Sequence, residues 1–154
     1  MSEYYNHRAK EILSSIRYAT VATVTPDGKP WNSPVAHEIT EDNTIYWFSD
    51  KENQHSINVR NHPYAYIVIY DSTVPEGDGE GVYIEATIEE LSGAEEINQI
   101  RNHKKQQVVD DASEFLGDAA RRCYKATPLR MWMNDAEVKD GKFIRDYKVK
   151  LNLI

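Results

Sequence analysis

Hydrophobic and polar residues alternate along much of the chain, and this period of two predicts β-strands. The clearest example is the β-branched run at residues 19–25, which ends in the turn sequence Pro-Asp-Gly-Lys at residues 26–29. Short turns join the first three runs, so we expect an antiparallel meander. The strands predicted in this way span residues 19–25, 30–39, 44–49, 64–70, 81–91, 129–138 and 143–151.

A helical period replaces the alternation in four places. Residues 3–17 place Tyr5, Ala9, Ile12 and Leu13 on one face, which predicts an amphipathic helix. Residues 52–61, 93–107 and 112–124 are the other predicted helices. Strands with a few inserted helices, and no regular βαβ alternation, are typical of a mainly β barrel. The length of 154 residues indicates a single domain over residues 1–154.

Composition narrows the classes of partner. The net charge of −7 disfavours nucleic acid, and the Arg121-Arg122 pair is interpreted as a solvated helix face. No run reaches transmembrane length and no secretory signal is recognisable, so we expect a cytoplasmic protein without a membrane partner. Cys123 is the only cysteine, which leaves no disulfide or Cys-based metal site within one chain.

The most informative segment is residues 47–63, where an aromatic strand end leads through polar residues into a short helix. The N-terminus of a helix presents unpaired N–H groups and suits an anion such as phosphate. Aromatic side chains before it could face a flat ring, so the segment indicates a planar, phosphorylated cofactor. The alternative is a helix start that merely satisfies its own N–H groups. The side-chain donors expected around the anion are Ser49, Asn53, Gln54, His55 and Ser56.

Histidines next to carboxylates invite a metal interpretation, which the predicted strand argues against. His37 and Glu38 are adjacent, and side chains at adjacent strand positions point to opposite faces. We therefore expect no metal site.

The ordered series of motifs resembles the pyridoxamine 5′-phosphate oxidase-like family of FMN-binding split barrels. The residues that carry the resemblance are the Pro-Asp-Gly-Lys-Pro turn at 26–30, the strand Trp-Asn-Ser-Pro-Val at 31–35, the strand at 45–49, and Gln-His-Ser-Ile-Asn-Val-Arg-Asn-His-Pro at 54–63. The resemblance covers nearly the whole chain. It implies a six-stranded antiparallel Greek-key barrel and a homodimer with FMN between the subunits.

The resemblance also implies which residues contact FMN. Residues of the second strand would run beside the flavin: Asn32, Ser33, Pro34, Val35 and Ala36. Trp47, Phe48 and Ser49 would lie at the ring and ribityl chain, and Asn53, Gln54, His55 and Ser56 would hold the phosphate. Trp132 would reach the flavin from the partner subunit. Trp47 and Trp132 could instead fill the barrel core.

The chain departs from the vitamin-forming oxidases at charged positions. Ser33 and Glu38 stand where those enzymes carry Arg and Lys, and Glu52-Asn53 replaces an Arg-Lys pair. A carboxylate at Glu38 would repel a phosphate ester, so we predict an FMN oxidoreductase acting on another small molecule. The catalytic residues are not predicted. Two alternatives remain open: a non-catalytic flavin- or haem-binding or stress-related protein, and a deazaflavin-dependent reductase.

Overall fold

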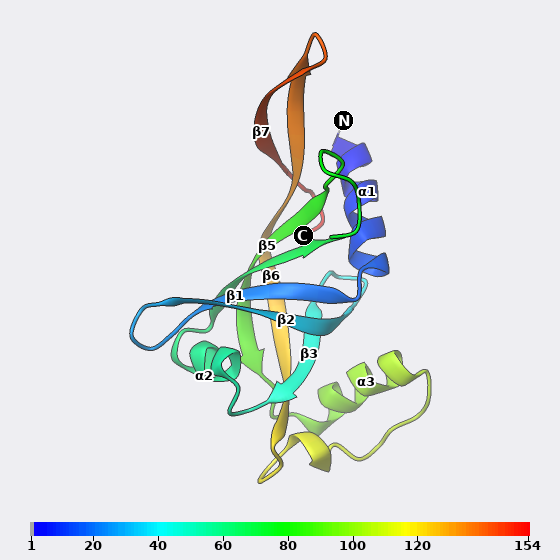
Figure 1. Cartoon of the computed structure of the whole chain (residues 1–154). Coiled ribbons are helices and arrows are strands. Elements are labelled where there is room, and N and C mark those ends of the chain that lie inside the picture. The colour runs from blue at the N-terminus through cyan, green and yellow to red at the C-terminus, as the bar shows by residue number, and fades with distance from the viewer. Residues whose placement is uncertain (1) are drawn as a thin grey trace.

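The computed structural model describes residues 2–154, which form three α-helices, a 3₁₀ turn and seven strands (Figure 1). In chain order the elements are α1 (Ser2–Ser15), β1 (Tyr18–Val24), β2 (Pro30–Ile39), β3 (Ile45–Asp50), α2 (Gln54–Asn61), β4 (Tyr64–Tyr70), β5 (Gly81–Glu90), α3 (Ala94–Lys105), the turn η1 (Ser113–Phe115), β6 (Arg121–Lys139) and β7 (Lys142–Lys150).

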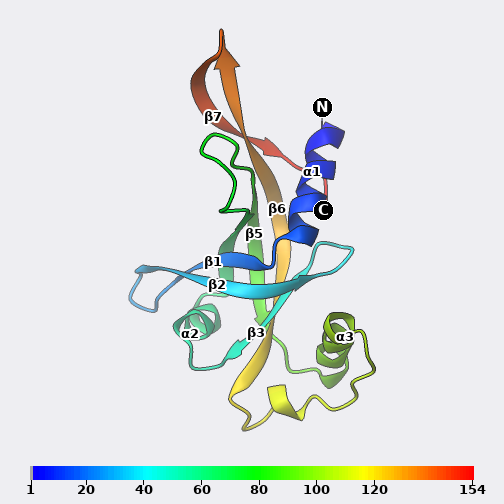
Figure 2. The same ribbon diagram turned by 45° about the vertical axis from the view of Figure 1, so that its right-hand side comes forward.

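Six of the strands close into a barrel. The antiparallel sheet has the order β3-β2-β1-β4-β5-β6-β7. An additional pairing between β3 and β6 closes the first six strands of this order into a ring. β4 lies beside β1 rather than β3, which is a Greek-key order. The predicted six-stranded barrel is therefore confirmed, and β7 is a seventh strand that pairs with the far half of the long β6. The β6–β7 hairpin extends beyond the barrel, at the top of Figures 1 and 2.

The barrel is split along β2. Residues 37–39 of β2 pair with β3, whereas residues 30–36 pair only with β1. Pro34 lies in this one-sided part of the strand. Proline has no N–H to donate to a sheet, so it is tolerated at a strand edge.

The interior of the barrel is apolar and is covered at one end by α1. Ala9, Ile12 and Leu13 of α1 are buried in the same cluster as Val21 and Ile67 of the strands. These are the residues that the sequence placed on the apolar face of the first helix. The burial of this face explains the helical period of the apolar residues in this segment.

A second, smaller hydrophobic cluster joins α3 and η1, which lie beside the barrel in Figure 2, to β3. Ile97 and Ile100 of α3 pack with Phe115 of η1 and Tyr46 of β3. Cys123 is completely buried there, and burial raises the pKa of its thiol to about 12. The thiol is thus protonated and inaccessible, as expected of a structural cysteine.

The helix predicted at residues 112–124 is wrong. Only Ser113–Phe115 form a 3₁₀ turn, and the chain is extended from Arg121 onward as β6. This segment pairs with β3 on one side, where Phe48 faces Cys123, and with β5 on the other. Backbone groups buried between two strands must be hydrogen bonded. An extended segment at this place can form hydrogen bonds with the strands on both of its sides.

The expected C-terminal hairpin is present. Asp140 and Gly141 form its turn with φ angles of 51° and 72°, the left-handed conformation that Asp-Gly turns adopt between antiparallel strands. Within residues 2–154, no helix combines the length and apolar character needed to cross a membrane.

Candidate functional site

The one-sided segment of β2 presents the predicted flavin-binding residues on both of its faces. Asn32 and Pro34 are exposed on the outer face, and Ala36 beside them is half-buried. Val35 points inward and is 5% exposed, so only its backbone can reach a ligand outside the barrel. Ser33 accepts a hydrogen bond from the Trp31 indole N–H at 3.0 Å.

The three predicted residues of β3 do not share one surface. Trp47 is 1% exposed and stacks on Tyr124 in the barrel core, with ring centroids 5.8 Å apart. Phe48 points the other way and packs on Phe115 at 4.6 Å. Ser49 is half-buried beside Arg122 of β6. The structure therefore leaves the Trp47 side chain no access to a flavin ring outside the barrel.

The start of α2 offers backbone donors rather than side-chain donors. Asn53 precedes the helix, and its side chain makes no capping hydrogen bond. The first backbone hydrogen bond into the helix comes from Ile57, which donates to the Asn53 carbonyl at 3.0 Å. Among residues 2–154, we find no backbone partner for the N–H groups of Gln54, His55 and Ser56. Three N–H groups in one helical turn form an anion site when their surroundings permit.

Most side chains of this turn are buried or form hydrogen bonds within the protein. Gln54 donates to Asn58 at 2.7 Å, and Ser56 donates to the Asp50 carbonyl at 2.8 Å. His55 is 6% exposed, and burial lowers the pKa of its imidazole, which favours the neutral ring. Of the four predicted phosphate ligands, Asn53 alone is exposed.

The sequence missed basic residues that fold toward this turn. Arg60 donates to the Lys51 carbonyl at 2.5 Å, so both residues lie next to the β3–α2 connection. Arg122, predicted on a helix face, instead lies beside Ser49 because β6 pairs with β3. Glu90 forms ion pairs with Arg60 and Arg122, both at 3.3 Å. The pairing of β6 with β3 and β5 brings Arg122 into this cluster, and no local pattern signals it.

Trp132 lies far from α2 within one chain. It is half-buried on the outer face of the barrel and stacks on Tyr66, with ring centroids 6.3 Å apart. Between Trp132 and the exposed part of β2 lie β5, β4 and β1. Four strand spacings of about 4.8 Å place the two about 19 Å apart along a convex surface. A single chain does not bring Trp132 and Pro34 together.

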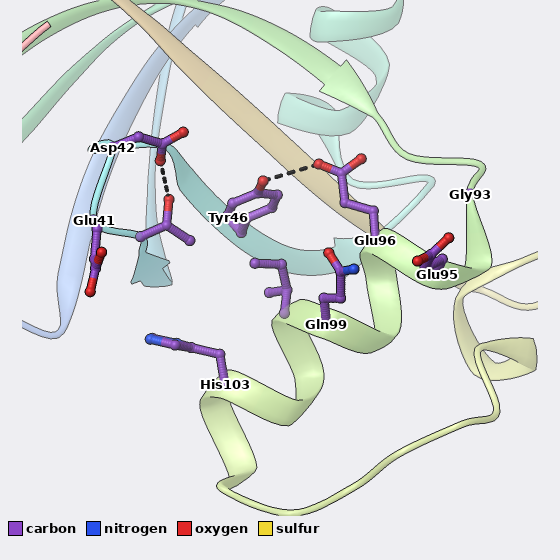
Figure 3. Close-up of a pocket in the computed structure, with 10 residues that line it drawn as sticks. Glu41, Asp42, Tyr46, Gly93, Glu95, Glu96, Gln99 and His103 are labelled. Atoms are coloured by element: carbon purple, nitrogen blue, oxygen red, sulfur yellow. Dashed lines mark hydrogen bonds between the residues drawn. The ribbon is translucent and has the colours of Figure 1, made fainter.

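A wide hollow lies elsewhere, between the β2–β3 turn and α3 (Figure 3). It has a volume of about 920 Å³, and Glu41, Asp42 and Glu95 surround it. On one side Tyr46 donates to Glu96 at 3.0 Å, and burial together with this carboxylate raises the pKa of the tyrosine to about 12.

His103 separates this hollow from a smaller one of about 400 Å³ beside His37. The His103 imidazole lies 3.4 Å from the Glu38 carboxylate. Burial lowers the pKa of His37, whose ring is therefore neutral near pH 7. None of the predicted phosphate ligands borders either hollow.

Comparison of folds agrees with this architecture. The haem-binding protein of Mycobacterium smegmatis superposes with a TM-score of 0.64 at 17% identity, over 92% of this chain and 56% of that one. The haem storage protein HutZ of Vibrio cholerae gives 0.65 at 14% identity, over 80% and 89%. A putative pyridoxamine 5′-phosphate oxidase of Listeria innocua gives 0.63 at 16% identity, over 82% and 94%. At these identities the likeness is one of fold.

Sequence comparison gives the family. No curated protein matches the chain. The model of the family described as pyridoxamine 5′-phosphate oxidase matches residues 5–135, which is more than half of the chain. The match includes β1, β2, β3 and α2, the elements that carry the expected cofactor site. The chain therefore belongs to the pyridoxamine 5′-phosphate oxidase family and has its split-barrel fold.

Proposed function

We propose that the protein is an FMN-binding flavoprotein that oxidises or reduces a small organic molecule. The observation that carries this proposal is the start of α2 in a member of this family. Three backbone N–H groups that have no backbone partner within residues 2–154 stand at a helix N-terminus, beside Asn53, whose side chain makes no capping hydrogen bond. Such a turn suits the dianionic phosphate of FMN, because N–H groups and the helix dipole both favour negative charge.

The chain's own residues would divide the binding between them. The first turn of α2 would hold the phosphate, and Arg60, which is paired with Glu90, lies next to the β3–α2 connection. The free edge of β2 at residues 30–36 would direct backbone groups toward the flavin ring. Bound FMN would supply hydride transfer, and the protein would supply orientation and hydrogen bonds.

The site needs a second copy of the chain. Trp132 and Pro34 lie on one convex outer surface, so a flat ring beside β2 cannot also touch Trp132 of the same chain. A homodimer joined through these outer faces would bring Trp132 of one copy to β2 of the other. This arrangement supports the expected placement of the cofactor between subunits.

The substrate of this flavoprotein would not be pyridoxamine phosphate. Ser33 accepts a hydrogen bond from Trp31, and the Glu38 carboxylate lies 3.4 Å from the His103 imidazole. Neither Ser33 nor Glu38 offers a cation to a phosphate ester. A carboxylate at Glu38 disfavours such a dianion.

Haem is the second candidate ligand, favoured by the fold neighbours from Mycobacterium smegmatis and Vibrio cholerae. A haem iron needs an axial ligand, and His103 is an exposed imidazole at the hollow beside α3. The carboxylates of Glu41, Asp42 and Glu95 around that hollow would repel haem propionates. Electrostatics therefore disfavours haem at this hollow.

The absorption spectrum of the protein as isolated tests the choice of cofactor. We expect the two visible bands of oxidised flavin, released into solution when the protein is denatured. A protein that is colourless and does not take up added FMN would refute the proposal. A strong Soret band without flavin would establish haem instead. Bleaching of the flavin by NADH or NADPH would then separate an enzyme from a carrier.

A further inference from the structure

Three aromatic side chains from neighbouring strands gather on the outer face of the barrel. Tyr83 of β5 lies opposite Trp132 of β6, and Tyr66 of β4 stacks on Trp132 with an angle of 13° between the rings. All three are half-buried, and each exposes part of its ring. Together they form an aromatic surface to which a flat molecule can bind.

Lys148 of β7 extends over this aromatic surface. Its ammonium nitrogen lies 4.4 Å from the centre of the Tyr83 ring and 5.3 Å from that of Tyr66. It also donates to the Tyr66 hydroxyl at 3.2 Å. Contacts with rings orient an ammonium group without cancelling its charge.

Lys148 has no carboxylate partner within ion-pair distance among residues 2–154, where twelve such pairs occur. Arg130, the other cation over these rings, is bound to Glu85 at 2.5 Å. Lys104, which lies 5.8 Å from the centre of the Phe48 ring, is the comparable cation at the α3 layer. Lys148 is therefore available to an anion.

A hollow of about 270 Å³ adjoins this position. Its walls include Val68 and Tyr70 of β4, Tyr83 of β5 and Asn134 of β6. An engineered cavity of about 150 Å³ binds benzene, so a single aromatic ring has room here. Glu80 also borders the hollow, but its carboxylate is held by Arg8 at 2.6 Å. Lys148 does not line the hollow, but it lies opposite Asn134 and over the ring of Tyr83, which both do.

We propose that the hollow beside Tyr83, together with Lys148, binds a small aromatic carboxylate. The ring would lie against Tyr83 and Val68, and the carboxylate would meet the Lys148 ammonium group. Trp132, the residue expected at the flavin of a second copy, is the direct neighbour of Tyr83. A small aromatic carboxylate is thus the class of substrate that we assign to the flavin. This assignment rests on the proposed function, whereas the binding site itself does not.

The test is a ligand-observed NMR titration of the full chain with benzoate, and with benzyl alcohol as its uncharged analogue. We expect weak, saturable binding of benzoate and weaker binding of the alcohol. Lys148→Gln should weaken benzoate about fivefold, the effect of an exposed ion pair, and leave the alcohol unchanged. Lys148→Arg should restore benzoate. The matched control is Lys139→Gln, which removes the same charge at the tip of the hairpin.

Two results of this titration would overturn the proposal. Absence of benzoate binding, including through burial of this face in a dimer, would overturn the proposal. An equal loss in Lys139→Gln would assign the effect to net charge and overturn it as well. Because Lys148 is exposed, its substitution is not expected to unfold the chain, and circular dichroism checks this.

Benzoate binding that depends on Lys148 in a protein unable to bind FMN would uphold the site and refute the proposed function. FMN binding without benzoate binding would do the reverse.

Discussion

Asn53 has a backbone geometry that makes the anion site testable atom by atom. Its φ and ψ angles of −59° and 146° are the extended conformation preferred before a proline. Gln54, the next residue, is the first of α2, a position where proline is well tolerated because its N–H has no helical partner. One backbone N–H can therefore be removed from the candidate site without breaking the helix.

Gln54→Pro should weaken FMN binding about tenfold or more, since a charge-assisted hydrogen bond contributes about 1.5–3 kcal/mol. Gln54→Ala is the matched control, because it removes the side-chain bond to Asn58 but keeps the N–H. Fluorescence titration with FMN measures both variants. If Gln54→Pro binds FMN as well as Gln54→Ala does, the phosphate lies elsewhere.

At the scale of single residues, the sequence indicates a turn suited to phosphate but not which atoms face outward. Trp47 and Trp132 are equivalent candidates for stacking in the sequence. The structure separates them, because Trp47 is 1% exposed in the core and Trp132 is half-buried on the surface. Side-chain orientation depends on which strands pair, and that information is not local.

Among the elements, the layer formed by α3 and η1 packs on the barrel around one aromatic residue of η1, Phe115. Phe115 packs on Phe48 of β3, and the guanidinium groups of Arg101 and Arg121 lie over its ring, each 5.0 Å from the centre. Arg101 also donates to the Asp111 carbonyl, which ties α3 to the segment before η1. This cluster is separate from the barrel core, so the layer can loosen by itself.

Phe115→Ala should destabilise this layer by about 3 kcal/mol, at the lower end for a buried phenylalanine. Hydrogen exchange followed by mass spectrometry should show faster exchange in α3 and unchanged exchange in β1 and β4. Leu116→Ala, at the half-buried next position, should have a smaller effect. Equal acceleration in β1 and β4 would show that the layer and the barrel unfold as one unit.

The element that sequence reasoning misassigned is the first half of β6. Arg121, Arg122 and Lys125 resemble the polar face of a helix around the apolar Cys123 and Tyr124. β3 and β5 each lack a partner on one side until this segment pairs with both. Tertiary pairing overrides local periodicity in such a case. The strands with clear alternation or a turn signal, β1, β2, β4 and β5, were predictable because their own residues encode them.

At the scale of the whole molecule, the barrel's outer surface separates the two halves of the proposed site. The start of α2 and the free edge of β2 lie at one side, and Trp132 lies four strands away across the sheet. Pairing two barrels through their outer faces, as proposed, would bring Trp132 of one copy to the free edge of β2 in the other. The family and the fold could be predicted from the order of motifs. The separation of Trp132 from α2 and β2 could be recognised only in the folded barrel.

Mixing two defective variants tests whether the site is shared between copies. Trp132→Ala lacks the aromatic residue, and Gln54→Pro lacks the N–H; each alone should bind FMN poorly. In a mixed dimer, one of the two sites combines an intact α2 with an intact Trp132. Random association of the two chains should therefore restore FMN binding in about a quarter of all sites. If both halves of the site came from one chain, mixing would restore none. Absorbance of protein-bound flavin after co-refolding, with each variant refolded separately as the control, gives the measurement.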